Sequence, residues 1–138
     1  MDTKQLEREL KAQVNQFFPE LDLKQIKFCE GTDSSPEGTY IFVKDGKFNV
    51  VFTEKGKIRT HEKYNEFGEV LWDVLEIVLF DMAMDYAMKN REQGKDFRRP
   101  LFKREIELYA RFGTDFKSRK VNEINKILEE NPYNDSGL

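Results

Sequence analysis

The segment TYIFVKDGKFNVVFTEKGKIRTHEKY, residues 39–64, contains three runs of β-branched and aromatic residues separated by two short glycine-containing turns. Asp45-Gly46 stands between the first two runs, and Gly56 lies in the turn before the third. An Asp-Gly pair between two such runs is typical of a tight hairpin turn. The segment therefore predicts a three-stranded antiparallel meander.

The middle run predicts how side chains divide between the two faces of this sheet. Successive residues of a strand point to opposite faces. The two sets are Phe48, Val50 and Phe52 on one face and Lys47, Asn49 and Val51 on the other. We expect the first set to cover a core and the second to face water.

Helical patterns flank the strands on both sides. Apolar residues recur at helical spacing from Thr3 to about Gln16, and Pro19 ends this pattern. Residues 23–29, LKQIKFC, predict a further strand, which brings the sheet to about four strands. A long helix is expected from Phe67 to about Arg91, with its second half apolar nearly all round and therefore at the centre of the domain.

Two more helices complete the predicted order. One begins near Pro100 and ends by Gly113, and the last is capped by Thr114 and stops at Asn131-Pro132. The order of an N-terminal helix, an antiparallel sheet and three C-terminal helices is typical of the α+β class. We expect one domain over residues 1–138.

The amino-acid composition excludes several classes of protein and of functional site. Charged residues make up 36% of the 138 residues and hydrophobic residues 38%, as in globular proteins. Neither a signal peptide nor a membrane-spanning segment is apparent, so we expect a cytoplasmic protein that does not contact a membrane. Cys29 and His61 are the only cysteine and histidine, which excludes disulfides and Cys/His zinc sites within one chain. We expect no cofactor, a buried Cys29 and a solvated His61.

Charge is distributed unevenly along the chain. Residues 66–85 contain six acidic and no basic residues, whereas residues 86–128 contain twelve basic and six acidic residues. An acidic stripe on the long helix, with aromatic residues at its edge, is a candidate surface for a protein partner. Its members are Glu66, Glu69, Asp73 and Glu76, with Trp72 and Tyr64 as candidate anchors. The alternatives are an ordinary solvated helix face for the acids and a position in the core for Trp72.

Asp81 and Asp85 lie one helical turn apart, on a side of the long helix that we expect to be apolar. One interpretation is an acid/base pair or a divalent-metal site in a small hydrolase or metal-binding enzyme. The interpretation we prefer is structural, because buried carboxylates need partners and cations are dense nearby. The candidate partners are Arg91, Arg98, Arg99 and Arg104.

The segment KDFRRPLFKR, residues 95–104, mixes arginine with phenylalanine, as nucleic-acid sites can. The overall charge is −3 and acids interrupt the basic run, which argues against direct nucleic-acid binding.

The C-terminal half contains the segment DYAMKNREQGKDFRRPLFKREIELYARF, residues 85–112. It is followed, after five residues, by SRKVNEINKILEENPYND, residues 118–135. This order resembles the C-terminal half of the immunity protein 63 family, small bacterial proteins encoded beside polymorphic toxins. The resemblance covers about residues 67–135. It departs from the expected pattern at Phe116, where a tryptophan is expected shortly before the last helix.

The resemblance implies an immunity protein of a toxin–immunity pair, of the kind that operates in contact-dependent growth inhibition. Such a protein binds one cognate toxin domain, for example a nuclease, in a 1:1 complex and occludes its active or substrate-binding site. The resemblance supplies no catalytic residue and no small-molecule substrate. The acidic stripe suits this role, because carboxylates can take the place of a substrate phosphate.

Overall fold

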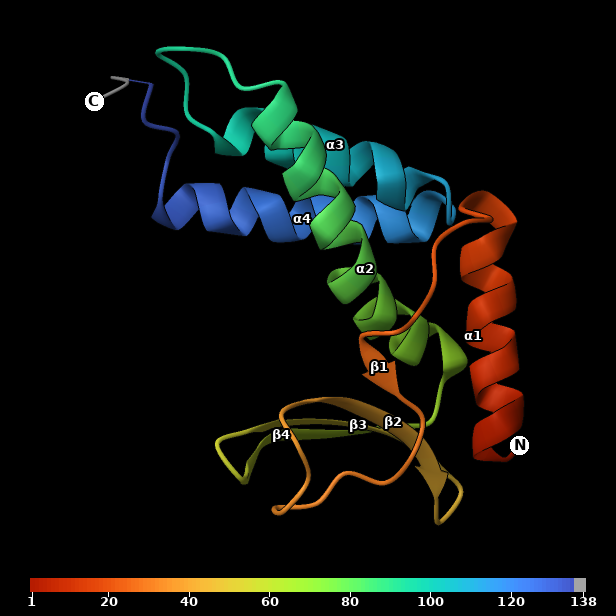
Figure 1. Cartoon of the computed structure of the whole chain (residues 1–138). Coiled ribbons are helices and arrows are strands. Elements are labelled where there is room, and N and C mark those ends of the chain that lie inside the picture. Colours follow the sequence, from red (N-terminus) through yellow and green to blue (C-terminus); the bar gives the residue numbers. More distant parts are fainter. Residues whose placement is uncertain (136–138) are drawn as a thin grey trace. The chain divides into compact units, whose positions relative to one another are not determined.

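The computed structural model describes residues 1–135 and confirms the α+β class (Figure 1). The chain divides into two compact units, Met1–Val74 and the segment from Leu75 onward. The elements are α1 (Thr3–Phe17), β1 (Ile26–Lys27), β2 (Gly38–Lys44), β3 (Lys47–Glu54), β4 (Lys57–Tyr64), α2 (Phe67–Lys89), α3 (Arg98–Ala110) and α4 (Thr114–Glu130). Residues 67–74 of α2 belong to the first unit, and the rest of this helix belongs to the second.

Helix α1 begins where the sequence places a capping box. The carboxylate of Asp2 accepts the backbone N–H of Gln5, and the Gln5 side chain accepts the N–H of Asp2. These reciprocal bonds satisfy two backbone donors that the first turn leaves open. The predicted apolar face is confirmed, since Leu6, Leu10 and Val14 are fully buried.

The predicted meander is confirmed, and the four strands form one sheet in the order β1-β2-β3-β4 (Figure 1). Positive φ angles at Asp45 and Gly46 turn the first hairpin, and positive φ angles at Lys55 and Gly56 turn the second. The strand predicted over residues 23–29 is only two residues long and pairs with β2 in parallel. The sheet is therefore mostly antiparallel, with one short parallel edge.

The division of β3 into a buried and a wet face is wrong. Asn49, Val51 and Thr53 are all buried, and Val51 packs in a cluster with Tyr40 and Phe42. The loop between β1 and β2 is bonded to this face, because the Pro36 carbonyl accepts the hydroxyls of Tyr40 at 2.6 Å and Thr53 at 2.7 Å. A long loop that folds back onto a sheet leaves no signal in strand periodicity.

Helix α2 has the predicted length, but its second half is not buried all round. Ala83 and Ala87 are fully buried, whereas Phe80 is 43% exposed and Met88 is 68% exposed. The helix therefore keeps one solvent-facing side along residues 77–89 that contains apolar side chains.

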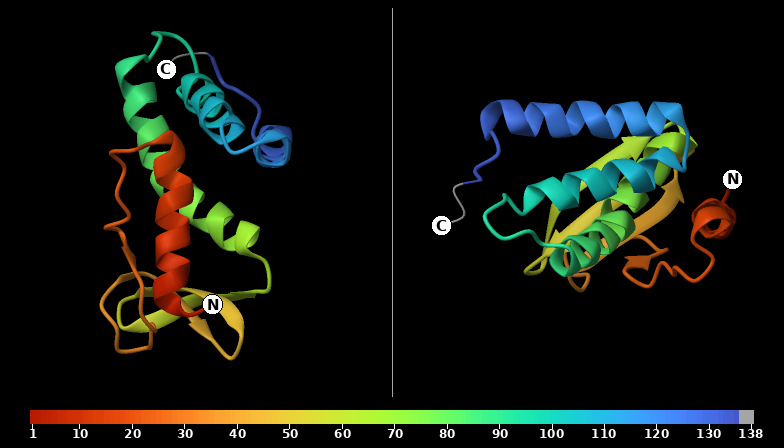
Figure 2. Two further views of the ribbon diagram at one scale, coloured as in Figure 1. Left: turned by 90° about the vertical axis from the view of Figure 1, so that its right-hand side faces the viewer. Right: turned by 90° about the horizontal axis from the view of Figure 1, so that it is seen from above.

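Helices α3 and α4 lie side by side, and the right-hand view of Figure 2 shows that they run in opposite directions. Pro100 lies in the first turn of α3, where its missing N–H removes no helical hydrogen bond. Thr114 is the first helical residue of α4 and not its cap, which is Gly113 with φ of 112°. Helix α4 ends at Glu130, directly before Asn131-Pro132, as predicted.

Candidate partner-binding surfaces

The acidic stripe is partly used inside the molecule. The Tyr64 hydroxyl donates to a carboxylate oxygen of Asp73 at 2.7 Å, and burial together with Asp73 raises the pKa of Tyr64. Trp72 is only 4% exposed, which places it in the core, as the alternative interpretation predicts, and not among the exposed aromatic residues. At the start of α2, in the first unit, Glu66 is exposed and Glu69 is half-buried.

Glu76, the last member of the stripe, belongs to a buried ionic cluster in the second unit. Its carboxylate lies 3.1 Å from the Lys120 ammonium, which also contacts Glu123 at 2.9 Å and Glu105 at 3.6 Å. The Tyr109 hydroxyl donates to Glu76 at 3.3 Å. Lys120 and Glu105 are 1% and 5% exposed, whereas the side chains of Glu76 and Glu123 are 35% and 39% exposed, so the cluster joins α2, α3 and α4 around a buried ammonium and reaches solvent at its edge.

Burial sets the protonation of this cluster. Desolvation raises the pKa of Glu105 and of Glu76, although Lys120 opposes the shift at both carboxyls. Burial works against the charge on Lys120, but hydrogen bonds and charges from Glu123, Glu76 and Glu105 outweigh it and raise the Lys120 pKa. The lysine therefore remains charged and holds the three carboxylates together.

This cluster was not predicted, although the sequence contains a signal for it. Lys120 stands one turn before the buried Ile124 on α4, and Glu105 lies between the buried Leu101 and Leu108 on α3. A lysine and a glutamate at apolar positions of two successive helices indicate a buried ion pair.

The predicted burial of Asp81 and Asp85 is corrected by the structure. Both aspartates are exposed, and Asp85 pairs with Lys89 at 3.1 Å, one turn further along α2. An exposed pair of this kind contributes little to stability. The error arises from the expectation that this part of α2 is buried on all sides.

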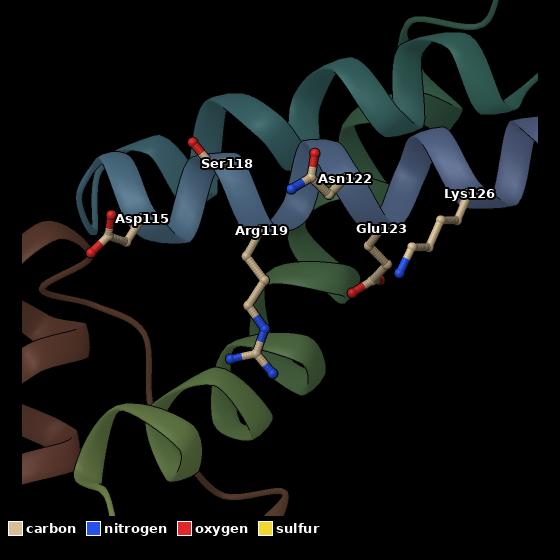
Figure 3. Close-up of a pocket in the computed structure, with 6 residues that line it drawn as sticks. All are labelled: Asp115, Ser118, Arg119, Asn122, Glu123 and Lys126. Atoms are coloured by element: carbon tan, nitrogen blue, oxygen red, sulfur yellow. The ribbon is translucent and has the colours of Figure 1, made fainter.

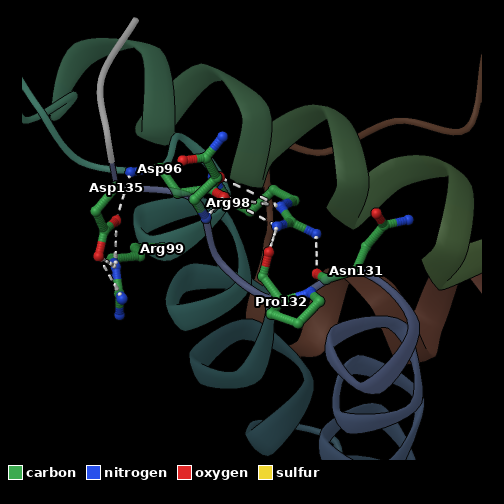
Figure 4. Close-up of polar contacts among 7 residues, drawn as sticks. Asp96, Arg98, Arg99, Asn131, Pro132 and Asp135 are labelled. Carbon is green, nitrogen blue, oxygen red and sulfur yellow. Dashed lines mark hydrogen bonds and ion pairs between the residues drawn. The ribbon is translucent and has the colours of Figure 1, made fainter.

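Arg98 and Arg99 instead bind the segment that follows α4 (Figure 4). Arg98 pairs with Asp96 at 2.9 Å and donates to the carbonyl oxygens of Asn131 and Pro132, both at 2.9 Å. Arg99 pairs with Asp135 at 2.6 Å.

Further contacts complete this corner of the second unit. The Tyr133 ring lies under the Arg99 guanidinium, with its centroid 4.1 Å away. Arg91 lies over the Phe97 ring, and Arg104 lies over the Tyr86 ring. Arg98 and Arg99, at the end of the segment NREQGKDFRR (residues 90–99), therefore hold the beginning of α3 against the residues after α4.

A pocket of about 430 Å³ lies on the sheet face of the first unit, between the β1–β2 loop and strands β2, β3 and β4. Phe42 and Asn49 line it, and His61 Nε2 lies 2.8 Å from Asn49 Oδ1. His61 is exposed, as predicted, whereas Cys29 is exposed and not buried. Charges of both signs line this pocket, so it does not select one ligand charge.

The loop wall of this pocket is held in place by several contacts. The Asp33 carboxylate accepts the Ile58 backbone N–H at 3.0 Å, and Glu30 pairs with Lys44 at 2.9 Å. A Cβ atom on Gly31 would lie 2.8 Å from the Tyr40 ring, so only glycine fits there without a shift. The loop is therefore ordered before any partner arrives.

A second hollow, of about 560 Å³, lies along α4 (Figure 3). The side chains of Arg119, Glu123 and Lys126 extend from one side of the helix in this view. Mixed charges on a single helix provide no enclosed site for a small molecule.

Within residues 1–135, no group of three or more His, Cys, Asp or Glu side chains is arranged to hold a metal ion. Across the same residues, no helix is both long and apolar enough to span a membrane.

Comparison with known proteins is decisive for the family. No curated protein and no solved structure matches the chain. The model of the family described as immunity protein 63 matches residues 44–126, which is more than half of the chain. The match begins earlier than the resemblance over residues 67–135 predicts, and it includes β3, β4, α2 and α3 and most of α4. The chain belongs to the immunity protein 63 family and is an immunity protein, which implies a cognate toxin partner.

Proposed function

We propose that the protein neutralises its cognate toxin domain by binding it directly in a 1:1 complex that occludes the active or substrate-binding site. Membership of the immunity protein 63 family is the observation that carries this proposal. Immunity proteins of this kind are typically not enzymes, so protection requires a stoichiometric contact. A nuclease remains one candidate for the toxin.

Charge supports a role for α2 in the encounter. The segment 66–85 contains six acidic residues and no basic residue, and Glu66, Asp81 and Asp85 are exposed. Acidic surfaces accelerate association with basic partners, and salt screens this effect. Asp73 and Glu76, by contrast, are bonded within the molecule.

The test is titration of the purified toxin domain, encoded beside this chain, with increasing amounts of the immunity protein. Direct occlusion predicts that toxin activity falls in proportion to the added protein and reaches its minimum at one equivalent. The same preparations, examined by size-exclusion chromatography with light scattering, should contain a 1:1 complex.

Two results would contradict the proposal. Complete inactivation by far less than one equivalent would indicate that the immunity protein modifies the toxin catalytically. A stable complex with full toxin activity, measured on the natural macromolecular substrate, would exclude occlusion.

A further inference from the structure

An apolar stripe runs along the solvent-facing side of α2 in the second unit. Phe80, Met84 and Met88 are spaced four residues apart and therefore lie on one face of the helix. Phe80 is 43% and Met88 is 68% exposed, and Met84 between them is half-buried. The only other exposed large hydrophobic residues in the described part of the chain are Met1 and Ile127. Two of these four exposed residues, Phe80 and Met88, therefore lie on the same stripe of α2.

The stripe has an acidic margin. Asp81 and Asp85 follow Phe80 and Met84 by one residue each, which places the two carboxylates about 100° further round the helix. Both are exposed, and Asp85 pairs only loosely with Lys89, since both side chains are about 70% exposed. Ala83 and Ala87 are fully buried, and Ala87, seven residues after Phe80, lies close to it around the helix, so the stripe borders the packed side of α2.

The residue types of this apolar stripe are typical of a binding surface. Phenylalanine and methionine are enriched in the buried centres of protein interfaces, and methionine adapts its shape to a partner. Exposed carboxylates contribute little alone, but they select a partner by charge and speed the encounter. The stripe also supplies the apolar anchors that buried Trp72 cannot.

The identity of the occupant follows from charge. A second copy of this chain, docked through the same helix, would bring Asp81 and Asp85 towards the acids of the segment 66–85, which contains no basic residue, and the one nearby cation on α2, Lys89, is paired with Asp85. Repulsion of like charges disfavours that pairing. A partner with an apolar surface bordered by lysine or arginine meets no such penalty.

We propose that Phe80, Met84 and Met88 anchor the contact with the cognate toxin, and that the toxin presents an apolar patch with a basic margin facing Asp81 and Asp85. This inference rests on the proposed function and adds the place of the contact and the chemistry of the partner surface. All five residues lie within the segment that defines the family match.

The first experiment measures binding kinetics between the purified toxin domain and the variant Phe80→Ser with Met88→Ser. Loss of two desolvated anchors should raise the dissociation rate about 100-fold or more. Ile127→Ser, on the exposed side of α4 and 39% exposed, is the matched control and should change the rate less than about threefold. Asp81→Lys with Asp85→Lys should slow association at low salt and have little effect at high salt.

A second measurement does not depend on altered folding. The chain contains four methionines, Met1, Met82, Met84 and Met88, whose methyl signals can be followed by NMR in the intact protein. Addition of one equivalent of toxin should shift the signals of Met84 and Met88 and leave that of Met1 unchanged.

The outcomes separate this inference from the proposed function. Tight binding by the parent protein, with unchanged kinetics in the serine variant and unshifted Met84 and Met88 signals, would overturn the inference alone. Absence of any complex between the parent protein and the toxin would remove the proposed function as well. Dimers of the parent protein that Phe80→Ser converts to monomers without weakening toxin binding would assign the stripe to self-association and overturn the inference.

Discussion

The ammonium group of Lys120 lies 3.6 Å from a carboxylate oxygen of Glu105, and neither side chain is more than 7% exposed. Charges this deeply buried are tolerated only when partners compensate the loss of water. Three carboxylates together compensate the buried charge of Lys120, because Glu76 and Glu123 also contact the ammonium. Lys120 is therefore the common partner of three carboxylates from three helices.

Replacement of Lys120 by methionine should destabilise the protein by about 3–5 kcal/mol, because it leaves the buried Glu105 carboxylate without its cation. Chemical denaturation, followed by circular dichroism, measures this loss. Lys126→Met is the control, since Lys126 is exposed on the same helix and should change stability by less than about 0.5 kcal/mol. Addition of Glu105→Leu to Lys120→Met should restore part of the loss. Equal stability of both lysine variants would show that the cluster is not a stabilising unit.

The cluster should also make stability depend on pH in an unusual direction. Burial raises the folded-state pKa of Glu105 above its ordinary value of 4.5. The stability contributed by such a group is fully present below the ordinary pKa and is lost as pH rises through the folded-state pKa. Compared with Glu105→Gln, the parent protein should therefore lose relative stability as the pH increases from 4.5 upward. Denaturation of both proteins at a series of pH values checks this, and a constant difference would contradict it.

Asp135 predicts the opposite dependence. Its hydrogen bonds with the Arg99 side chain and the Asp96 backbone N–H lower its pKa to about 2. Stability from this carboxylate is present above the ordinary pKa of 3.8 and is lost as pH falls towards 2. The parent protein should exceed Asp135→Asn in stability by a constant amount from pH 7 to 5, and the two should converge at lower pH. Denaturation curves that remain parallel through this range would exclude the ionised pair as the cause.

Gly31→Ala should destabilise the first unit by about 1–3 kcal/mol, because the new methyl group overlaps the Tyr40 ring in the covered face of the sheet. Gly68 offers a matched control, since no atom lies within 4 Å of a Cβ placed there and the residue is in the first turn of α2. Gly68→Ala should raise stability by about 0.5–1 kcal/mol. Thermal unfolding of both variants decides the matter, and a stabilising Gly31→Ala would mean that the loop does not hold this position.

Replacement of Glu66 and Glu69 by lysine tests the part of the acidic stripe at the start of α2. If these acids steer the toxin, association should slow about tenfold or more at low salt and recover as salt screens the charges. Dissociation should change little, because rim charges act mainly on the encounter. Stopped-flow kinetics at two salt concentrations provides the measurement. An unaltered association rate would restrict steering to Asp81 and Asp85 or to another surface.

The hairpins and helix lengths were predictable because their signals are local. Asp45-Gly46 and Gly56 mark turns that positive φ angles require, and the apolar spacing of Leu6, Leu10 and Val14 marks one helix face. These features depend on neighbours in sequence, which a single chain displays fully.

The sites were harder to predict because they depend on contacts between distant residues. Burial of Asn49 and Val51 follows from a loop that folds back onto the sheet, which strand alternation does not reveal. Likewise, Arg98 selects Asp96 and the chain after α4 over Asp85, although all the charges are visible in the sequence. Charge density predicts that ion pairs form, but only the packing of helices decides which ones.

Arg98 and Arg99 bind residues that lie beyond the end of the family match, so the folded unit extends further along the chain than the match does. The family match stops at residue 126, whereas the groups that receive these arginines, on Asn131, Pro132 and Asp135, come later in the chain. A protein truncated at the end of the matched segment would retain both guanidinium groups and lose their acceptors outside it. A relative that ends with the matched segment would need other contacts to hold the beginning of α3 in place.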